Sequence, residues 1–121
     1  MKENLDRNIE EAEKREKVYI WGTGRYGRKV LRTIKTENCR VLGFVDNDPS
    51  KRGKTYENIE IISFNEIAED YDVLIIGIVN YDAVIYQLER EKYMDSSKII
   101  VFFDESFCEN SHYFHIIDYQ K

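Results

Sequence analysis

Four short runs of apolar residues divide the chain, and each one stops at a glycine or a polar residue. The runs cover residues 18–21, 41–45, 73–79 and 99–103. Polar positions do not alternate with apolar ones within them, which is typical of parallel strands buried on both faces. A weaker fifth strand is expected at residues 60–62. The pattern therefore predicts a mainly parallel sheet.

Apolar residues at helical spacing fill the segments between and before these runs. An amphipathic helix is expected within residues 1–16, ahead of a domain that spans residues 17–121. Further helices are predicted at 25–35, 64–68 and 82–92, and the pair Ser63 and Glu66 forms a capping-box pattern at the start of the second of these. Strands that alternate with helices form right-handed βαβ units. We expect about five strands in the order 3-2-1-4-5, with helices on both faces of the sheet.

The segment Gly22-Thr23-Gly24-Arg25-Tyr26-Gly27 has the pattern G-x-G-x-x-G. It follows the first predicted strand and opens the first predicted helix of the sheet, as in a doubly wound, Rossmann-like fold that binds a nucleotide. Gly22 would permit a tight turn, Gly24 would let a pyrophosphate approach the backbone, and Gly27 would let the helix pack closely. The N–H groups of the helix N-terminus would face the phosphate.

Polar residues at the ends of two other strands complete the candidate site. Asp46 ends the second strand, where an acid accepts hydrogen bonds from ribose hydroxyls; capping of the next turn is the alternative role. Asn80 ends the fourth strand and either faces the ligand or caps the next helix. The candidate ligand-binding residues are Gly22, Thr23, Gly24, Arg25, Tyr26, Gly27, Asp46, Asn47 and Asn80.

The charge at position 46 bears on the choice of nucleotide. A carboxylate repels a 2′-phosphate, so Asp46 favours NAD or a UDP-sugar over NADP. The alternative is that a flexible loop carrying three basic residues offsets that repulsion: Lys51, Arg52 and Lys54.

Composition narrows the class of protein further. With 121 residues, 42% of them hydrophobic and 34% charged, the chain has the size and balance of one globular domain. Its net charge of -5 argues against a nucleic-acid partner. It lacks an apolar run long enough to span a membrane and a signal-peptide pattern, and its two cysteines do not make a disulfide scaffold. A cytoplasmic location is expected.

The sequence contains no recognised catalytic or metal-binding pattern. No tyrosine is followed four residues later by lysine, the pair that short-chain dehydrogenases and sugar epimerases use. The spacing of Cys108, His112 and His115 fits no zinc pattern, so no metal is expected. The isolated chain is therefore expected to lack catalytic activity.

Residues 17–104 resemble a small bacterial module named for its likeness to nucleoside-diphosphate-sugar epimerases. The strings VYIWGTGRYGRKVLRTI and VLGFVDNDPSKRGKTYENIEIISFNEI carry the resemblance. Such modules accompany FkbM-family methyltransferases and glycosyltransferases and are similar to the N-terminal UDP-sugar-binding domain of PglD-type acetyltransferases. The resemblance implies that Gly22, Gly24, Gly27 and Asp46 contact the ligand, in a sugar- or polysaccharide-modifying system.

Three hypotheses of different kinds follow. The leading one is a binding module that holds NAD or a UDP-sugar for a partner or for a further catalytic domain, with homo-oligomers allowed. The second is a fragment of an enzyme, either an NAD-dependent epimerase or dehydratase for nucleotide sugars or a methyltransferase-associated protein. The third is a structural or oligomerisation domain with a vestigial pocket.

Overall fold

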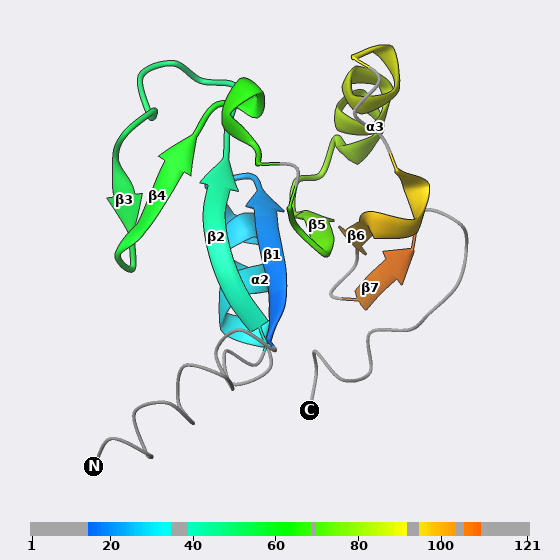
Figure 1. Cartoon of the computed structure of the whole chain (residues 1–121), viewed down its shortest axis with the longest axis horizontal. Coiled ribbons are helices and arrows are strands. Elements are labelled where there is room, and N and C mark those ends of the chain that lie inside the picture. The colour runs from blue at the N-terminus through cyan, green and yellow to red at the C-terminus, as the bar shows by residue number, and fades with distance from the viewer. Residues whose placement is uncertain (1–14, 35–38, 69, 92–94, 104–105, 110–121) are drawn as a thin grey trace.

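The computed structural model describes residues 15–34, 39–68, 70–91, 95–103 and 106–109, which build one sheet with helices against it (Figure 1). The sheet has seven strands in the order β3-β4-β2-β1-β5-β6-β7. The strands are β1 (Glu16–Trp21), β2 (Cys39–Val45), β3 (Thr55–Tyr56), β4 (Ile59–Ile62), β5 (Val73–Ile76), β6 (Ile99–Phe103) and β7 (Ser106–Glu109). The helices are α2 (Arg25–Thr33) and α3 (Tyr81–Arg90), with 3-10 turns η1 (Phe64–Glu66) and η2 (Ser96–Lys98).

The central part of the sheet confirms the predicted topology. The neighbouring pairs in the series β4-β2-β1-β5-β6 are all parallel, which is the predicted order 3-2-1-4-5. Each edge carries one more, antiparallel strand that was not predicted: β3 pairs with β4, and β7 pairs with β6. The β3–β4 hairpin turns through Glu57 and Asn58, which both have positive φ, as a two-residue hairpin turn requires.

Side chains of the central strands alternate between two cores, one on each face of the sheet. On the first face α2 contributes Val30 to a core that also contains Val18, Ile20, Phe44, Val73, Ile75 and Ile100. On the second face α3 contributes Val84 and Leu88 to a core that also contains Tyr19, Trp21, Val45, Leu74, Ile76 and Val101. Because each strand is buried on both sides, the apolar runs are continuous, and the expected helices on both faces are confirmed.

One strand and one helix are about half as long as predicted, whereas α2 and α3 differ from their predicted bounds by one or two residues. The strand expected at 73–79 ends at Ile76. Just beyond it, the backbone at Gly77 passes close to the first turn of α2, since a Cβ added at Gly77 would lie 3.1 Å from the Gly27 Cα. The helix expected at 64–68 is a single 3-10 turn, η1, although the predicted contacts between Ser63 and Glu66 at its start do form. A single turn suffices to place Phe64 against Trp21 in the second core.

Some expectations fall outside the described residues. They are most of the helix within residues 1–16 and the side chains of His112 and His115; for Cys108 only the backbone, in β7, is described. Within the described residues, neither helix is long and apolar enough to cross a membrane.

Candidate functional site

In the turn between β1 and α2, two of the three glycines of the motif have no room for a side chain. Gly22 has φ +113°, and its N–H donates to the Val45 carbonyl oxygen at 2.8 Å. A Cβ added at Gly27 would lie 1.9 Å from the Gly22 carbonyl oxygen, closer than any real Cβ contact. These two glycines therefore fold the loop back on the first turn of α2, and Gly27 packs against the loop itself.

Gly24 differs from the other two glycines because the space that a side chain would occupy is open. A Cβ added there would meet no atom within 4 Å, and the residue is exposed. It is the N-cap of α2 and supplies no side-chain cap to the helix. The first N–H groups of a helix have no partner within it, so the N-terminus of α2 is open to a ligand that accepts hydrogen bonds.

Asp46 lies next to this loop and joins it to the end of β2. Its Oδ2 accepts a hydrogen bond from the Thr23 hydroxyl at 2.6 Å, and its Oδ1 accepts the Asp48 N–H at 2.8 Å. The second bond is the turn-capping role weighed above. A carboxylate has about four lone-pair sites, so capping leaves acceptor capacity for a ligand. With 17% of its side chain exposed, Asp46 still reaches the surface.

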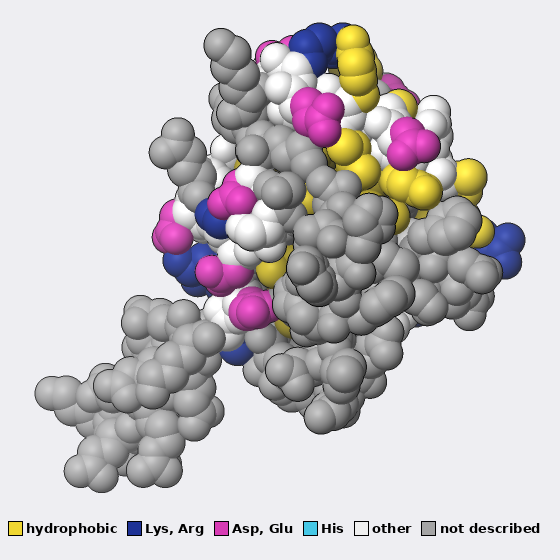
Figure 2. Space-filling model, turned by 90° about the vertical axis from the view of Figure 1, so that its right-hand side faces the viewer, with side chains coloured by type: hydrophobic (Ala, Val, Ile, Leu, Met, Phe, Trp, Pro, Cys, Tyr) yellow, Lys and Arg dark blue, Asp and Glu magenta, His cyan; other side chains and the backbone are white. Residues whose placement is uncertain are grey.

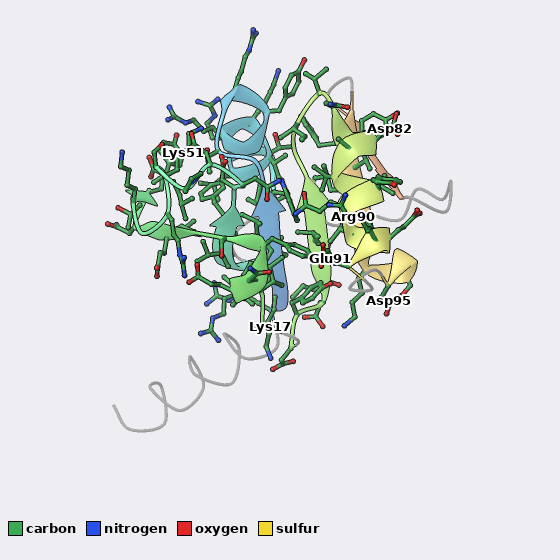
Figure 3. All side chains as sticks on the ribbon, turned by 90° about the horizontal axis from the view of Figure 1, so that it is seen from above. Lys17, Lys51, Asp82, Arg90, Glu91 and Asp95 are labelled. Atoms are coloured by element: carbon green, nitrogen blue, oxygen red, sulfur yellow. The ribbon has the colours of Figure 1, made fainter. Side chains whose placement is uncertain are left out.

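One basic side chain of the following turn reaches the same place. Lys51 Nζ donates to Thr23 Oγ1 at 3.1 Å and lies 3.5 Å from Asp46 Oδ2. Figure 3, which views the molecule from above, shows Lys51 on the α2 side of the molecule, away from α3. Arg52 instead pairs with Glu66 at 2.7 Å, and Lys54 is exposed. The sequence did not reveal which of the three approaches Asp46.

A pocket of about 220 Å³ opens beside Asp46, on the α3 side of the glycine loop. Four lining residues have apolar side chains, four have polar ones, and one is a glycine: Trp21, Ile78, Ala83, Val84, Asp46, Asn47, Asn80, Gln87 and Gly22. Asn47 and Gln87 pair across it, with Asn47 Nδ2 donating to Gln87 Oε1 at 2.9 Å and Gln87 Nε2 to Asn47 Oδ1 at 3.3 Å. Asn80 is the N-cap of α3 but makes no side-chain cap bond.

The remaining candidates lie apart from the pocket. Arg25 is exposed at the start of α2, whereas the ring of Tyr26 packs 6.4 Å from that of Phe102 in the first core. The Tyr26 side chain is thus partly buried against this core, while its backbone lies in the first turn of α2. Arg28 was not predicted: its Nε donates to the Thr23 carbonyl oxygen at 3.3 Å, and its guanidinium lies over Tyr56 at 4.6 Å.

Gln87 is the other residue that the sequence did not single out. It lies three positions after Val84 and one before Leu88, the two buried residues of α3, so helical spacing places it at the border of the buried face. That spacing is the one signal that the sequence held. Among the described residues, no group of three or more His, Cys, Asp and Glu is arranged to hold a metal ion.

The parallel strand order and the glycine turn define a Rossmann-like fold. Within that class, the chain belongs to the family described as C2185-like, N-terminal, whose model matches residues 14–101. None of the curated proteins matches the sequence.

Solved structures resemble the chain at low sequence identity. UDP-D-quinovosamine 4-dehydrogenase from Vibrio fischeri aligns with a TM-score of 0.60 and 16% identity over 88% of this chain and 99% of that one. RSP, a Rex-family repressor, aligns with a TM-score of 0.51 and 22% identity over 73% of this chain and 48% of its own. RSP in complex with β-NAD+ and operator DNA gives 0.52 and 18% over 82% and 56%. The chain thus spans about half the length of the repressor, and these likenesses establish the fold.

Proposed function

We propose that this chain is a binding module for a nucleotide or nucleotide sugar, with NAD and UDP-sugars as the leading ligands. The observation that carries the proposal is the pairing of an open helix N-terminus at Gly24 with a carboxylate, Asp46, held to the same loop by Thr23 at 2.6 Å. A phosphate would lie over the loop, and the ribose hydroxyls would bond to Asp46.

The charge of α2 supports the placement of the phosphate. The first turn of the helix contains no acidic residue, and the charged residues in the helix are all basic: Arg25, Arg28, Lys29 and Arg32. In a protein of net charge -5, this concentrates positive charge around the glycine loop. The helix dipole adds to it, because anions are favoured at helix N-termini.

The pocket beside Asp46 suits the base. At about 220 Å³ it is smaller than the roughly 300–1,000 Å³ of pockets that enclose a whole drug-sized ligand. It therefore has room for one part of a nucleotide, and the rest would lie along the surface over the loop. Its apolar side chains would contact the faces of a planar ring, and the Asn47 and Gln87 amides would face its polar edge.

The similar structures support the same ligand class. One is a Rex-family repressor in complex with β-NAD+ and operator DNA, and the other is named a UDP-D-quinovosamine 4-dehydrogenase. NAD and a UDP-sugar both contain a pyrophosphate and a ribose with free hydroxyls. The resemblance to modules that accompany FkbM-family methyltransferases and PglD-type acetyltransferases would place this chain in sugar or polysaccharide modification.

A second candidate is an NAD-dependent enzyme of nucleotide sugars. It is favoured by one observation: the unit shared with the Vibrio fischeri dehydrogenase covers 99% of that solved chain. The absence of a Tyr/Lys pair from the sequence argues for a module that relies on a partner or further catalytic domain. Formation of NADH from NAD and a UDP-hexose by the purified chain, lost on Gly24→Val, would establish the enzyme.

Thermal unfolding with a ligand panel tests the proposal. The panel is NAD, NADP, a UDP-sugar, a CDP-sugar and S-adenosylmethionine. A ligand present at about 100 times its Kd adds roughly 2.7 kcal/mol to the free energy of unfolding. We expect NAD or the UDP-sugar to raise the Tm of the wild type and not that of Gly24→Val. No rise with any nucleotide at millimolar concentration contradicts the proposal.

A further inference from the structure

The ammonium of Lys51 neutralises the carboxylate of Asp46, which would accept hydrogen bonds from the ribose hydroxyls. Lys51 Nζ lies 3.5 Å from Asp46 Oδ2 and donates to Thr23 Oγ1 at 3.1 Å, while the Thr23 hydroxyl donates to the same Oδ2 at 2.6 Å. The three side chains form a closed triangle that links the glycine loop, the end of β2 and the turn that follows it. Asp46 and Lys51 together carry no net charge.

This neutralisation changes the consequence of having an acid at position 46. An isolated carboxylate repels a 2′-phosphate, which is why the sequence favoured an unphosphorylated ribose. Here a phosphate that approaches Asp46 also approaches a cation within 4 Å of it. An ammonium has three donors, and only one of those on Lys51 is used by Thr23, so donors are left for an anion.

The contacts of Lys51 also differ from those of the two basic residues that follow it, Arg52 and Lys54. Thr23, which anchors Lys51, is 8% exposed, so the ammonium is held at a buried hydroxyl, while 42% of the Lys51 side chain remains exposed. Arg52 pairs with Glu66 at 2.7 Å, beside η1. Of the three basic residues that follow Asp46, Lys51 is therefore the one that lies where the ribose hydroxyls would bind.

We propose that Lys51 admits nucleotides with a phosphate on the ribose, such as NADP or 2′,5′-ADP, to the site that Asp46 would otherwise restrict to unphosphorylated ones. The inference rests on the proposed function, and it names Lys51 as the residue that sets the preference. Lys51 would hold the 2′-phosphate, and Asp46 would keep the ammonium in place through Thr23.

Calorimetric titration of NAD and NADP into four proteins tests this. The first two are the wild type and Lys51→Met, which keeps most of the side-chain length without the charge. The other two are Lys51→Arg, which keeps the charge, and Arg52→Met as the matched control. We expect wild-type Kd values for NADP and NAD within about tenfold of each other. Lys51→Met should weaken NADP binding relative to NAD by about tenfold or more, the effect of losing a hydrogen bond to a charged group. Arg52→Met should leave the ratio unchanged, and Lys51→Arg should preserve it.

The outcomes separate this inference from the proposed function. If NAD or a UDP-sugar binds the wild type but NADP does not, the inference is overturned and the proposed function stands. The same holds if Lys51→Met and Arg52→Met change the ratio equally, or if neither changes it. If the folded wild type binds no nucleotide, the proposed function is wrong and the inference with it. The wild-type ratio is informative by itself, so the test survives a variant that fails to fold.

Discussion

The glycine motif contains three glycines that differ in the space available for a side chain: Gly22, Gly24 and Gly27. Gly27 is enclosed, since a Cβ there would lie 1.9 Å from the Gly22 carbonyl oxygen, whereas a Cβ at Gly24 would meet no atom within 4 Å. Gly24 has φ -86°, which any residue adopts. The motif therefore contains glycines that the packing of the loop requires and one, Gly24, that this packing does not require.

This difference gives a prediction for stability. Gly27→Ala should lower the free energy of unfolding by about 1–3 kcal/mol or more, because backbone must move to admit the methyl group. Gly24→Ala, the matched control, should stay within about 1 kcal/mol of the wild type, since only the N-cap changes. Urea unfolding of both variants checks this. Equal losses would mean that the loop is not packed as described.

Asp46 gives a prediction for binding. Asp46→Ala should weaken a nucleotide with free ribose hydroxyls by about 1.5–3 kcal/mol, the range for a hydrogen bond to a charged group. Asp46→Asn is the better-matched variant, because an amide oxygen can still accept the Asp48 N–H that caps the turn. Titration of the three proteins measures the loss. If Asp46→Asn binds as tightly as the wild type, the carboxylate does not read the ribose.

At the scale of elements, four of the five parallel strands were predictable because burial on two faces leaves continuous apolar runs. The fifth, β4, gave a weaker signal because only one of its four residues is buried. Both long helices were predictable from apolar residues at helical spacing. Strand β3 was not, since Thr55–Tyr56 is two residues long and is defined by the positive φ of Glu57 and Asn58. The length of β5 was overestimated, because Ile78 and Val79 continue the apolar run after the strand has ended. The apolar run alone does not show that the backbone after Ile76 passes close to the first turn of α2.

The same limit applies to the candidate site. Asp46 and the glycines were found because their positions relative to strand ends are local features of the sequence. The contacts of Lys51 with Thr23 and of Gln87 with Asn47 join residues 28 and 40 positions apart, and side-chain placement decides them. Tyr26 was included for its place within the motif, and the helical phase of α2 packs its partly buried ring against the first core.

The buried face of α3 gives a prediction at the scale of the element. Leu88 is 1% exposed and packs in the second core, while Tyr86 is 63% exposed. Figure 2, which faces the side of the molecule where α3 lies, shows hydrophobic side chains gathered near the top with acidic ones among them. Leu88→Ala should cost about 2–5 kcal/mol, and Tyr86→Ala about 0.5 kcal/mol or less. Denaturant unfolding distinguishes them, and comparable losses would contradict this packing of α3.

For the whole molecule, pKa shifts predict how stability depends on pH. Hydrogen bonds from Ser50 lower the pKa of Asp48, and those from Ser63 lower the pKa of Glu66. Lys17 lowers the pKa of Asp70, and hydrogen bonds from Ser97 lower the pKa of Asp95. Burial raises the pKa of Cys39 from 9.0 to about 12. The groups therefore act at opposite ends of the pH range.

The carboxylates contribute stability above their unfolded pKa values of 3.8 and 4.5, and lose it as the pH falls towards the lower folded values. Cys39 stays neutral in the fold while the unfolded thiol ionises, so stability declines as the pH rises above 9.0. We expect a Tm plateau between about pH 5 and pH 9, with losses on both sides. In a Cys39→Ala variant the alkaline loss should shrink, and an unchanged alkaline limb would assign that loss to other groups.

The central claim is that a nucleotide lies over the loop 22–27 with its ribose at Asp46, and an amide NMR titration of the wild type with NAD or a UDP-sugar tests it most directly. The account predicts saturable shifts of the backbone N–H signals of Gly24, Arg25 and Asp46, with smaller changes at Asn47 and Asn80. Signals from β6 and β7, at the far edge of the sheet, should stay in place. The absence of saturable shifts, or their concentration away from the glycine loop, would contradict the account.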